Sequence, residues 1–184
     1  LLIFALAASS LNLILGYGGM VSFGHAAFFG VGGYVIGILA QSDILSAWVG
    51  WPLAIVVTSL LAVVIGAISL RTRDVYFIMI TLAFAQMLFF LFNSLRQYGG
   101  QDGISFDRSL IGLGINLEDN TTFYYVVLIA VLGSLYCLYR IIHSRFGHVL
   151  QSIKANETRM TAIGYPTYRY KLVGFMIGGA FAGL

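Results

Sequence analysis

The sequence has little charge. Lys, Arg, Asp and Glu make up 9% of its 184 residues, whereas 59% are hydrophobic and the mean hydropathy is +0.91. A typical soluble domain has about 25% charged residues, and a soluble chain this apolar would expose large apolar patches and aggregate. The net charge of +3 gives no clustered basic surface of the kind that nucleic-acid binding needs. These properties indicate a membrane protein and exclude a nucleic-acid partner.

Other absences narrow the function. The single cysteine, Cys137, lies in an apolar run and cannot form an internal disulfide, so we expect it to pack as a small hydrophobe. The sequence has no Gly-x-x-x-x-Gly-Lys-Ser/Thr phosphate loop, no Cys/His cluster with metal spacing and no nucleophile elbow. It also lacks a pair of carboxylates within its apolar segments. We therefore expect no catalysis, and no cofactor or metal ion held by this chain itself.

The apolar segments are long enough to predict membrane spans, which need about 20 residues each. Six are expected, at 1–15, 18–40, 51–70, 75–93, 122–142 and 170–184. The predicted fold is an all-α, polytopic transmembrane bundle that forms a single domain over 1–184. Because the chain starts without Met and ends inside an apolar run, we expect it to be a fragment of a longer protein.

The charges predict how the spans are oriented. The regions 71–74 and 140–171 hold eight of the ten Lys and Arg residues, whereas the loop 94–121 holds four of the seven acidic residues. Alternating spans put both basic regions on one side, which is cytoplasmic by the positive-inside rule. The acidic loop is then external. Its turn signals at Tyr98-Gly-Gly-Gln-Asp-Gly103 suit either a plain surface loop or a docking surface and substrate mouth.

The segment from Gly16 to Gly37 combines eight of the 22 glycines with one histidine. An ionisable side chain inside a membrane is costly and needs a reason to be there. In one interpretation, polar groups and aromatics line a path for a solute with an apolar body. In the other, His25 donates to a backbone carbonyl freed by a helix break. A proton relay is disfavoured, since no membrane carboxylate accompanies the histidine. The candidate pathway residues are Ser22, Phe23, His25 and Phe28.

Glycines at four-residue spacing predict close helix contacts. Gly33 and Gly37 have this spacing in the glycine-rich segment. The pairs Gly174/Gly178 and Gly179/Gly183 repeat it in the last span. Close packing alone explains most of these glycines.

The loop 143–169 predicts short amphipathic helices. Val149, Leu150 and Ile153 share one helical face. Asn156 or Thr158 is placed to cap a second short helix, which Gly164 and Pro166 would close. Such helices either lie on the membrane surface or dock into a groove of a cytoplasmic partner.

Four stretches, in order, resemble one known family. They are Leu11–Tyr34, Arg73–Ala85, Gly99–Ile104, and Ser144–Gly147 with the Asn156-Glu157, Ala162, Gly164 and Tyr170–Leu172 positions that follow it. Together they resemble the signature of the branched-chain amino acid ABC transporter permease family, of the LivM type. The resemblance covers most of the chain.

The resemblance implies a membrane permease subunit of an ATP-driven ABC importer for branched-chain or other hydrophobic amino acids, or related small solutes. The expected partners are a second permease subunit, two cytoplasmic ATPase subunits that bind ATP and Mg, an external solute-binding protein and membrane lipid. The expected location is the bacterial plasma or inner membrane. The loop 143–169 would be the coupling loop. Its candidate residues for contact with the ATPase are Arg145, Gly147, Ile153, Asn156, Glu157 and Gly164.

Some positions depart from the family pattern. Ala155 stands where an acidic residue is usual, and Thr-Arg-Met follows Glu157 where small and apolar residues are usual. The alternatives are an ATP-independent secondary transporter or channel, and a structural subunit with no path of its own. A secondary transporter would predict an intramembrane charge or ion site, and the sequence has neither.

Overall fold

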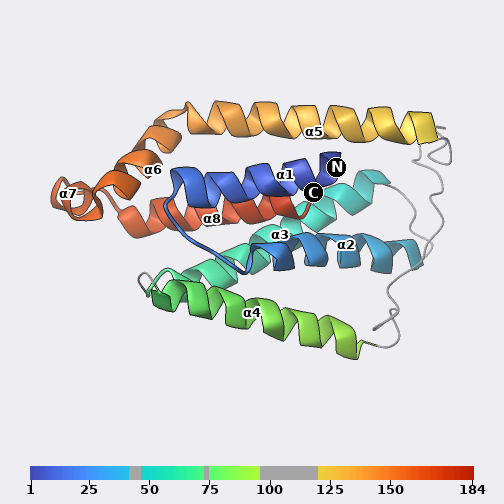
Figure 1. The fold of residues 1–184 in the computed structure, drawn as a ribbon, viewed down its shortest axis with the longest axis horizontal. Coiled ribbons are helices and arrows are strands. Elements are labelled where there is room, and N and C mark those ends of the chain that lie inside the picture. The colour runs from blue at the N-terminus through green and yellow to red at the C-terminus, as the bar shows by residue number, and fades with distance from the viewer. Residues whose placement is uncertain (42–46, 73–74, 96–119) are drawn as a thin grey trace.

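The computed structural model describes residues 1–41, 47–72, 75–95 and 120–184, and within these ranges it contains helices and no strand. Three described helical segments are long and apolar enough to cross a membrane, at Val49–Ser69, Val75–Ser94 and Thr121–Ile142. The predicted all-α transmembrane bundle is confirmed. The predicted loop 94–121 lies, apart from its ends, outside the described residues. The elements (Figure 1) are α1 (Leu2–Asn12), the π-helix η1 (Leu13–Tyr17), α2 (His25–Gln41), α3 (Ala47–Ser69), α4 (Val75–Ser94), α5 (Asn120–Ile142), α6 (Arg145–Ala155), α7 (Glu157–Ala162) and α8 (Thr167–Ala182).

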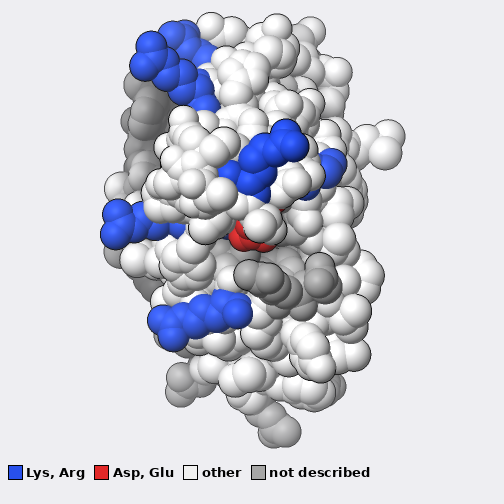
Figure 2. Space-filling model, turned by 90° about the vertical axis from the view of Figure 1, so that its left-hand side faces the viewer, with Lys and Arg blue, Asp and Glu red and all other residues white. Residues whose placement is uncertain are grey.

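The long helices run roughly side by side. α5 forms one side of the bundle and contacts α1, which contacts α8 (Figure 1). α2 and α3 pack on α8, and α4 forms the opposite side. Helices α6 and α7 lie at one end, together with the turn between α3 and α4. We call this the basic end, because Lys and Arg side chains gather over it (Figure 2). The positive-inside rule predicts that this end faces the cytoplasm.

The glycine-rich segment differs from the predicted span 18–40, since α2 begins only at His25. Before it, η1 ends where the Gly18 N–H donates to the Leu13 carbonyl at 3.0 Å, five residues back. Gly19 then has a φ of 67°, which side chains rarely adopt. Because glycine and serine are poor helix formers, residues 18–24 connect η1 to α2 without helical structure.

Two other helix starts also differ from the sequence. α3 begins at Ala47, four residues before the predicted start, and so carries Pro52 inside it. α8 begins at Thr167 rather than at 170, immediately after Pro166. Proline has no N–H to satisfy and suits this position before a helix.

Glycines bring α8 into close contact with its neighbours. A Cβ added at Gly179 would lie 2.6 Å from the Ala62 Cβ of α3, and one added at Gly183 would collide with Thr58. Gly178 is equally close to Ile14 of η1. The predicted close packing of the last span is therefore confirmed for these glycines. By contrast, Gly33 of α2 is exposed, and an added Cβ there would meet nothing within 4 Å.

Candidate transport pathway and coupling loop

His25 ties the start of α2 to α1. Its ring is only 6% exposed, and its Nε2 lies 2.8 Å from the Ser10 Oγ. The Ser10 hydroxyl donates to the Ala7 carbonyl at 2.7 Å. When the Ser10 proton is directed to the Ala7 carbonyl, the Ser10 oxygen accepts from the tautomer of His25 that carries its proton on Nε2. This contact agrees with the packing interpretation, in which His25 makes a structural hydrogen bond. The partner, however, is a serine hydroxyl and not the expected backbone carbonyl.

The other candidate pathway residues differ in burial and in the elements that they contact. Phe28 is buried in the core and packs edge-to-face on Phe175 of α8, with ring centroids 5.6 Å apart. By contrast, Phe23 is 63% exposed. Ser22 is buried, and neither its Oγ nor the Nδ1 of His25 has a hydrogen-bond partner in the described part of the chain. The role of these four residues in a pathway stays a prediction.

A cavity of about 570 Å³ lies on another face of α2, between this helix and α4. Its α2 wall includes the small residues Ala26, Ala27 and Gly30, together with Val31 and Tyr34. Its α4 wall carries two amide side chains, Gln86 and Asn93. Because this is a concave, mostly apolar space with a few polar groups, it has the properties of a small-molecule site.

The two helices approach each other at both ends of this cavity. Toward the basic end, a Cβ added at Gly24 would collide with the backbone of Thr81, so glycine is needed for this approach. Away from the basic end, the rings of Tyr34 and Phe92 stack with centroids 4.4 Å apart. The cavity is therefore bounded along the helix axes by a backbone contact and by an aromatic pair.

Two polar residues in the sequence indicate this cavity, but they are less conspicuous than the glycine-rich segment. Gln86 and Asn93 are seven residues apart in an otherwise apolar helix, and this spacing puts them on one face. Polar side chains inside a membrane helix are by default functional candidates. The side of α2 that they would meet, however, depends on packing that sequence periodicity does not give.

The coupling loop starts with a close approach to α5. The Ser144 side chain caps α6 by accepting from the Gly147 N–H at 3.4 Å. Gly147 is buried, and an added Cβ would collide with the Ile142 carbonyl at the end of α5. Ile153 and Leu150 are also buried, so the apolar face of α6 is directed into the protein.

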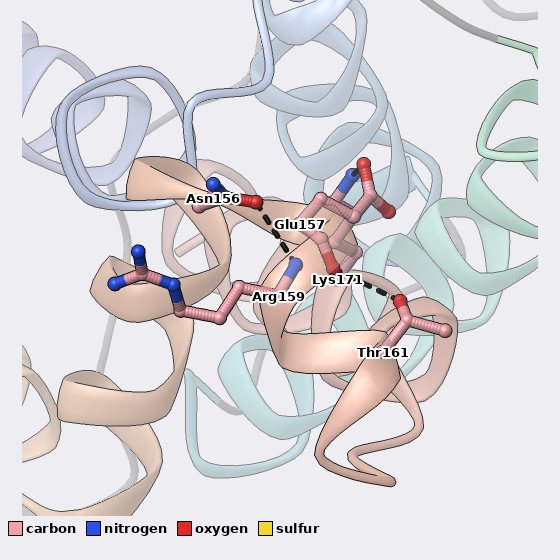
Figure 3. Close-up of polar contacts among 5 residues, drawn as sticks. All are labelled: Asn156, Glu157, Arg159, Thr161 and Lys171. Atoms are coloured by element: carbon pink, nitrogen blue, oxygen red, sulfur yellow. Dashed lines mark hydrogen bonds and ion pairs between the residues drawn. The ribbon is translucent and has the colours of Figure 1, made fainter.

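Asn156 separates the two short helices. It ends α6, and its Oδ1 accepts from the Arg159 N–H at 2.9 Å, which caps α7. The prediction that Asn156 or Thr158 caps this helix is confirmed for Asn156. The next residue, Glu157, pairs with Lys171 of α8 at 2.7 Å. In Figure 3 the side chain of Arg159 extends away from this pair.

α7 itself is attached by polar contact rather than by burial. It has no buried residue. A second cavity, of about 320 Å³, opens beside the Glu157–Lys171 pair and is lined in part by Met20 and Phe77. Gly164 follows α7 with a φ of 94°, and like Arg145 it is exposed at the basic end. The loop thus directs some of its predicted coupling residues inward and leaves others free to contact a partner.

Lys154 makes a link that sequence reasoning missed. From α6, its Nζ donates to the carbonyl of Gly16 in η1 at 2.6 Å. A Cβ added at Gly19 would lie 2.7 Å from the Lys154 Cγ, so the lysine stem packs on the glycine backbone. A cation at the carbonyl end of a helix is electrostatically favourable. The link joins the coupling loop to the first span.

Comparison with known proteins identifies the family. The family described as "Branched-chain amino acid transport system / permease component" matches residues 1–184. The chain belongs to this permease family. No solved structure matches it.

Relatives of known name agree with this assignment. The high-affinity branched-chain amino acid transport system permease proteins LivM of Salmonella typhimurium and Escherichia coli are 27% and 26% identical, each over 99% of this chain. A probable branched-chain amino acid transport permease protein LivM of Methanocaldococcus jannaschii is 26% identical over 95% of the chain. The chain spans 48% of the length of the first two proteins and 61% of the third. With its long apolar helices, this permease chain is a multi-pass protein of the cell membrane.

Proposed function

We propose that the chain is part of a membrane permease subunit of an ATP-driven ABC importer. The full permease would carry branched-chain or other hydrophobic amino acids, or related small solutes. It would work with a second permease subunit, two cytoplasmic ATPase subunits that bind ATP and Mg, and an external solute-binding protein. Family membership supports the transport role, and the names of the LivM relatives support the solute class.

The observation that carries the proposal is the folded and attached structure of the loop between α5 and α8. It is already folded into two helices at the basic end. It is attached to three membrane elements, through Gly147 to α5, through Lys154 to η1 and through Glu157 to α8. A push on a loop held in this way reaches several spans at once, as a rigid-body transition requires.

The burial pattern favours docking on a protein over lying on the membrane. A helix at the membrane surface buries its apolar face in the lipid boundary. In α6 the buried apolar residues Leu150 and Ile153 already face the protein. The outer surface at the basic end carries Arg145 and Arg159. This surface suits an acidic groove on an ATPase subunit.

The test is co-purification and uptake with the ATPase subunits present. Arg145→Glu should weaken retention of the ATPase and lower ATP-driven uptake, since charge reversal opposes an acidic groove. Arg71→Glu is the matched control, because Arg71 is an exposed arginine of the α3–α4 turn at the same end of the molecule. Equal retention and uptake in both variants and the wild type would contradict the docking role of the loop.

The alternative function, an ATP-independent transporter or channel, makes an opposite prediction. Vesicles that contain the permease subunits without any ATPase would then take up solute at the full rate. The importer proposal expects no concentrative uptake under this condition, and uptake only when ATPase subunits and ATP are supplied. Competition by leucine, isoleucine and valine against charged amino acids would define the solute class.

A further inference from the structure

We infer that the cavity between α2 and α4 is the compartment in which the permease holds its solute, and that Gln86 and Asn93 contact the polar part of a hydrophobic amino acid there. The inference rests on the proposed transport function. It assigns the solute to a different face of α2 from the one that holds the buried residues His25 and Phe28.

The size and lining of the cavity fit this solute class. Its volume of about 570 Å³ lies within the range of about 300–1,000 Å³ that is usual for small-molecule sites. The described lining is mostly apolar and contains no charged side chain. An aliphatic side chain would therefore find apolar surface, whereas a solute with net charge would lose its hydration without a partner of opposite charge.

The two amides supply the polar contacts. Each amide group offers two N–H donors and a carbonyl acceptor, so it can bind either a carboxylate or an ammonium group. Gln86 and Asn93 are seven residues apart, and at 1.5 Å per residue their Cα atoms are separated by about 10 Å along α4. Phe89 lies between them on the same lining. This order places apolar surface between two polar positions.

Gly30 provides the space opposite these amides. It lines the cavity, and a Cβ added there would meet no heavy atom within 4 Å. A larger residue would therefore extend into the cavity without disturbing the fold. Gly33 is also exposed on α2 and has the same free space around an added Cβ, but it does not line the cavity. Gly30 and Gly33 therefore form a matched pair, in which Gly30 lines the cavity and Gly33 does not.

The first experiment compares Gly30→Leu with Gly33→Leu in the full transporter. Gly30→Leu should lower leucine uptake by about tenfold or more, since a pocket discriminates at this level against a misplaced hydrocarbon group. Gly33→Leu should stay within about twofold of the wild type, as a surface substitution does. Both should retain the ATPase subunits. Normal uptake by Gly30→Leu, or an equal loss in both variants, would overturn the inference.

The second experiment does not depend on ATP-driven uptake, so it separates this inference from the proposed function. Cys137, which is exposed on α5, is first replaced by Ser to give a chain without cysteine. Gly30→Cys or Gly33→Cys is then added, and labelling by a thiol reagent is timed with and without L-leucine. Leucine should protect position 30 and leave position 33 unchanged. Protection of neither position, or of both equally, would overturn the inference.

The role of the amides can be tested by measuring the KM for leucine and the solute preference of variants at Gln86. Gln86→Leu should raise the KM for leucine more than it lowers kcat, because it removes a contact to the polar end of the solute. Gln86→Asn retains an amide and should recover part of the affinity. A Gln86→Leu variant with an unchanged KM and unchanged competition among neutral amino acids would overturn the role of Gln86.

Discussion

The two sides of α2 use glycine for opposite purposes. On the tight side, Gly32 contacts the backbone of α8 at Gly183, and α8 in turn approaches α3 through Gly179. On the open side, Gly30 meets nothing and borders the cavity with α4. Burial follows the same division, since 33% of the α3 span is buried but only 11% of the α4 span.

Glycine content alone therefore does not distinguish a helix that is packed against its neighbours from a helix that lines a transport path. A missing Cβ allows backbones to approach where another helix fills the space, and it leaves an empty volume where none does. Burial also differs between adjacent residues of α2. Phe28 is 1% exposed within the core, whereas Phe29 on the next position is 39% exposed.

The largest expected effect is on the tight side, at Phe28. Phe28→Ala should destabilise the protein by about 3–5 kcal/mol, because it leaves a cavity among α2, α3 and α8. Phe29→Ala, the comparison variant, should cost less, because Phe29 is 39% exposed, although it loses a ring contact with Phe4. Thermal unfolding in detergent measures both. A stable Phe28→Ala protein with altered solute preference would instead restore Phe28 to the pathway.

The packing on the tight side can also be tested by adding a side chain rather than removing one. Gly179→Leu should cost about 1–3 kcal/mol, because the added side chain has no space beside Ala62. Gly33→Leu adds the same atoms in open space and should cost little. Folded yield and the unfolding midpoint provide the measurement, and equal values for the two variants would show that α3 and α8 can separate freely.

Lys154 connects the coupling loop to the tight side, through η1. Lys154→Met should lower the solute transported per ATP hydrolysed about fivefold, which corresponds to the loss of about 1 kcal/mol from one charge-assisted hydrogen bond. Arg140→Met, an exposed cation in the last turn of α5, is the control. The ratio of transport to hydrolysis is the readout, because a general loss of folded protein lowers both rates together.

A covalent replacement sharpens this test. A Cβ added at Gly19 would lie 3.3 Å from the Lys154 Cβ, close to the 3.5–4.5 Å that is usual in disulfides. In a Cys137→Ser background, Gly19→Cys with Lys154→Cys should couple poorly when reduced and better when oxidised, and Gly19→Cys alone controls for the strain of a side chain at a φ of 67°. If oxidation abolished transport, the link would have to open in each cycle, contrary to the role of a fixed connection.

The smallest effect concerns the hydrogen bond between His25 and Ser10. In a double-mutant cycle with His25→Ala and Ser10→Ala, the coupling free energy should be about 1 kcal/mol, as expected for one buried hydrogen bond. Unfolding free energies of the four proteins supply the cycle. Additive changes would mean that the bond contributes nothing to holding α2, and would favour a pathway role for His25.

Local features were the most predictable from the sequence. Apolar length predicted the long helices, since the membrane sets the length of a span. The Asn156 cap was predictable because the side chain bonds to a backbone N–H only three residues away. The wide turn of η1 and the start of α2 at His25 were not, because poor helix formers weaken a helix without fixing where it ends.

Contacts between distant segments were least predictable. Lys154 and Gly16 are 138 residues apart in sequence, and no local pattern joins them. In the glycine-rich segment, the costly histidine drew attention to four residues, of which Ser22, His25 and Phe28 are buried and Phe23 is exposed. Gln86 and Asn93 were visible as polar residues in an apolar helix, but the cavity they share with Gly30 depends on how two helices meet.

The close backbone approach of α4 near its beginning has a mechanical consequence. Thr81 lies against Gly24, and Asn93 is twelve residues, or about 18 Å, farther along the helix. A tilt of about 10° about Thr81 would displace Asn93 by about 3 Å, while the Gly24 approach changed little. The stacked rings of Tyr34 and Phe92 would take up most of that displacement. A small rotation at the beginning of α4 would thus become a change in width at its far end, and the helix would act as a lever whose long arm carries Gln86 and Asn93.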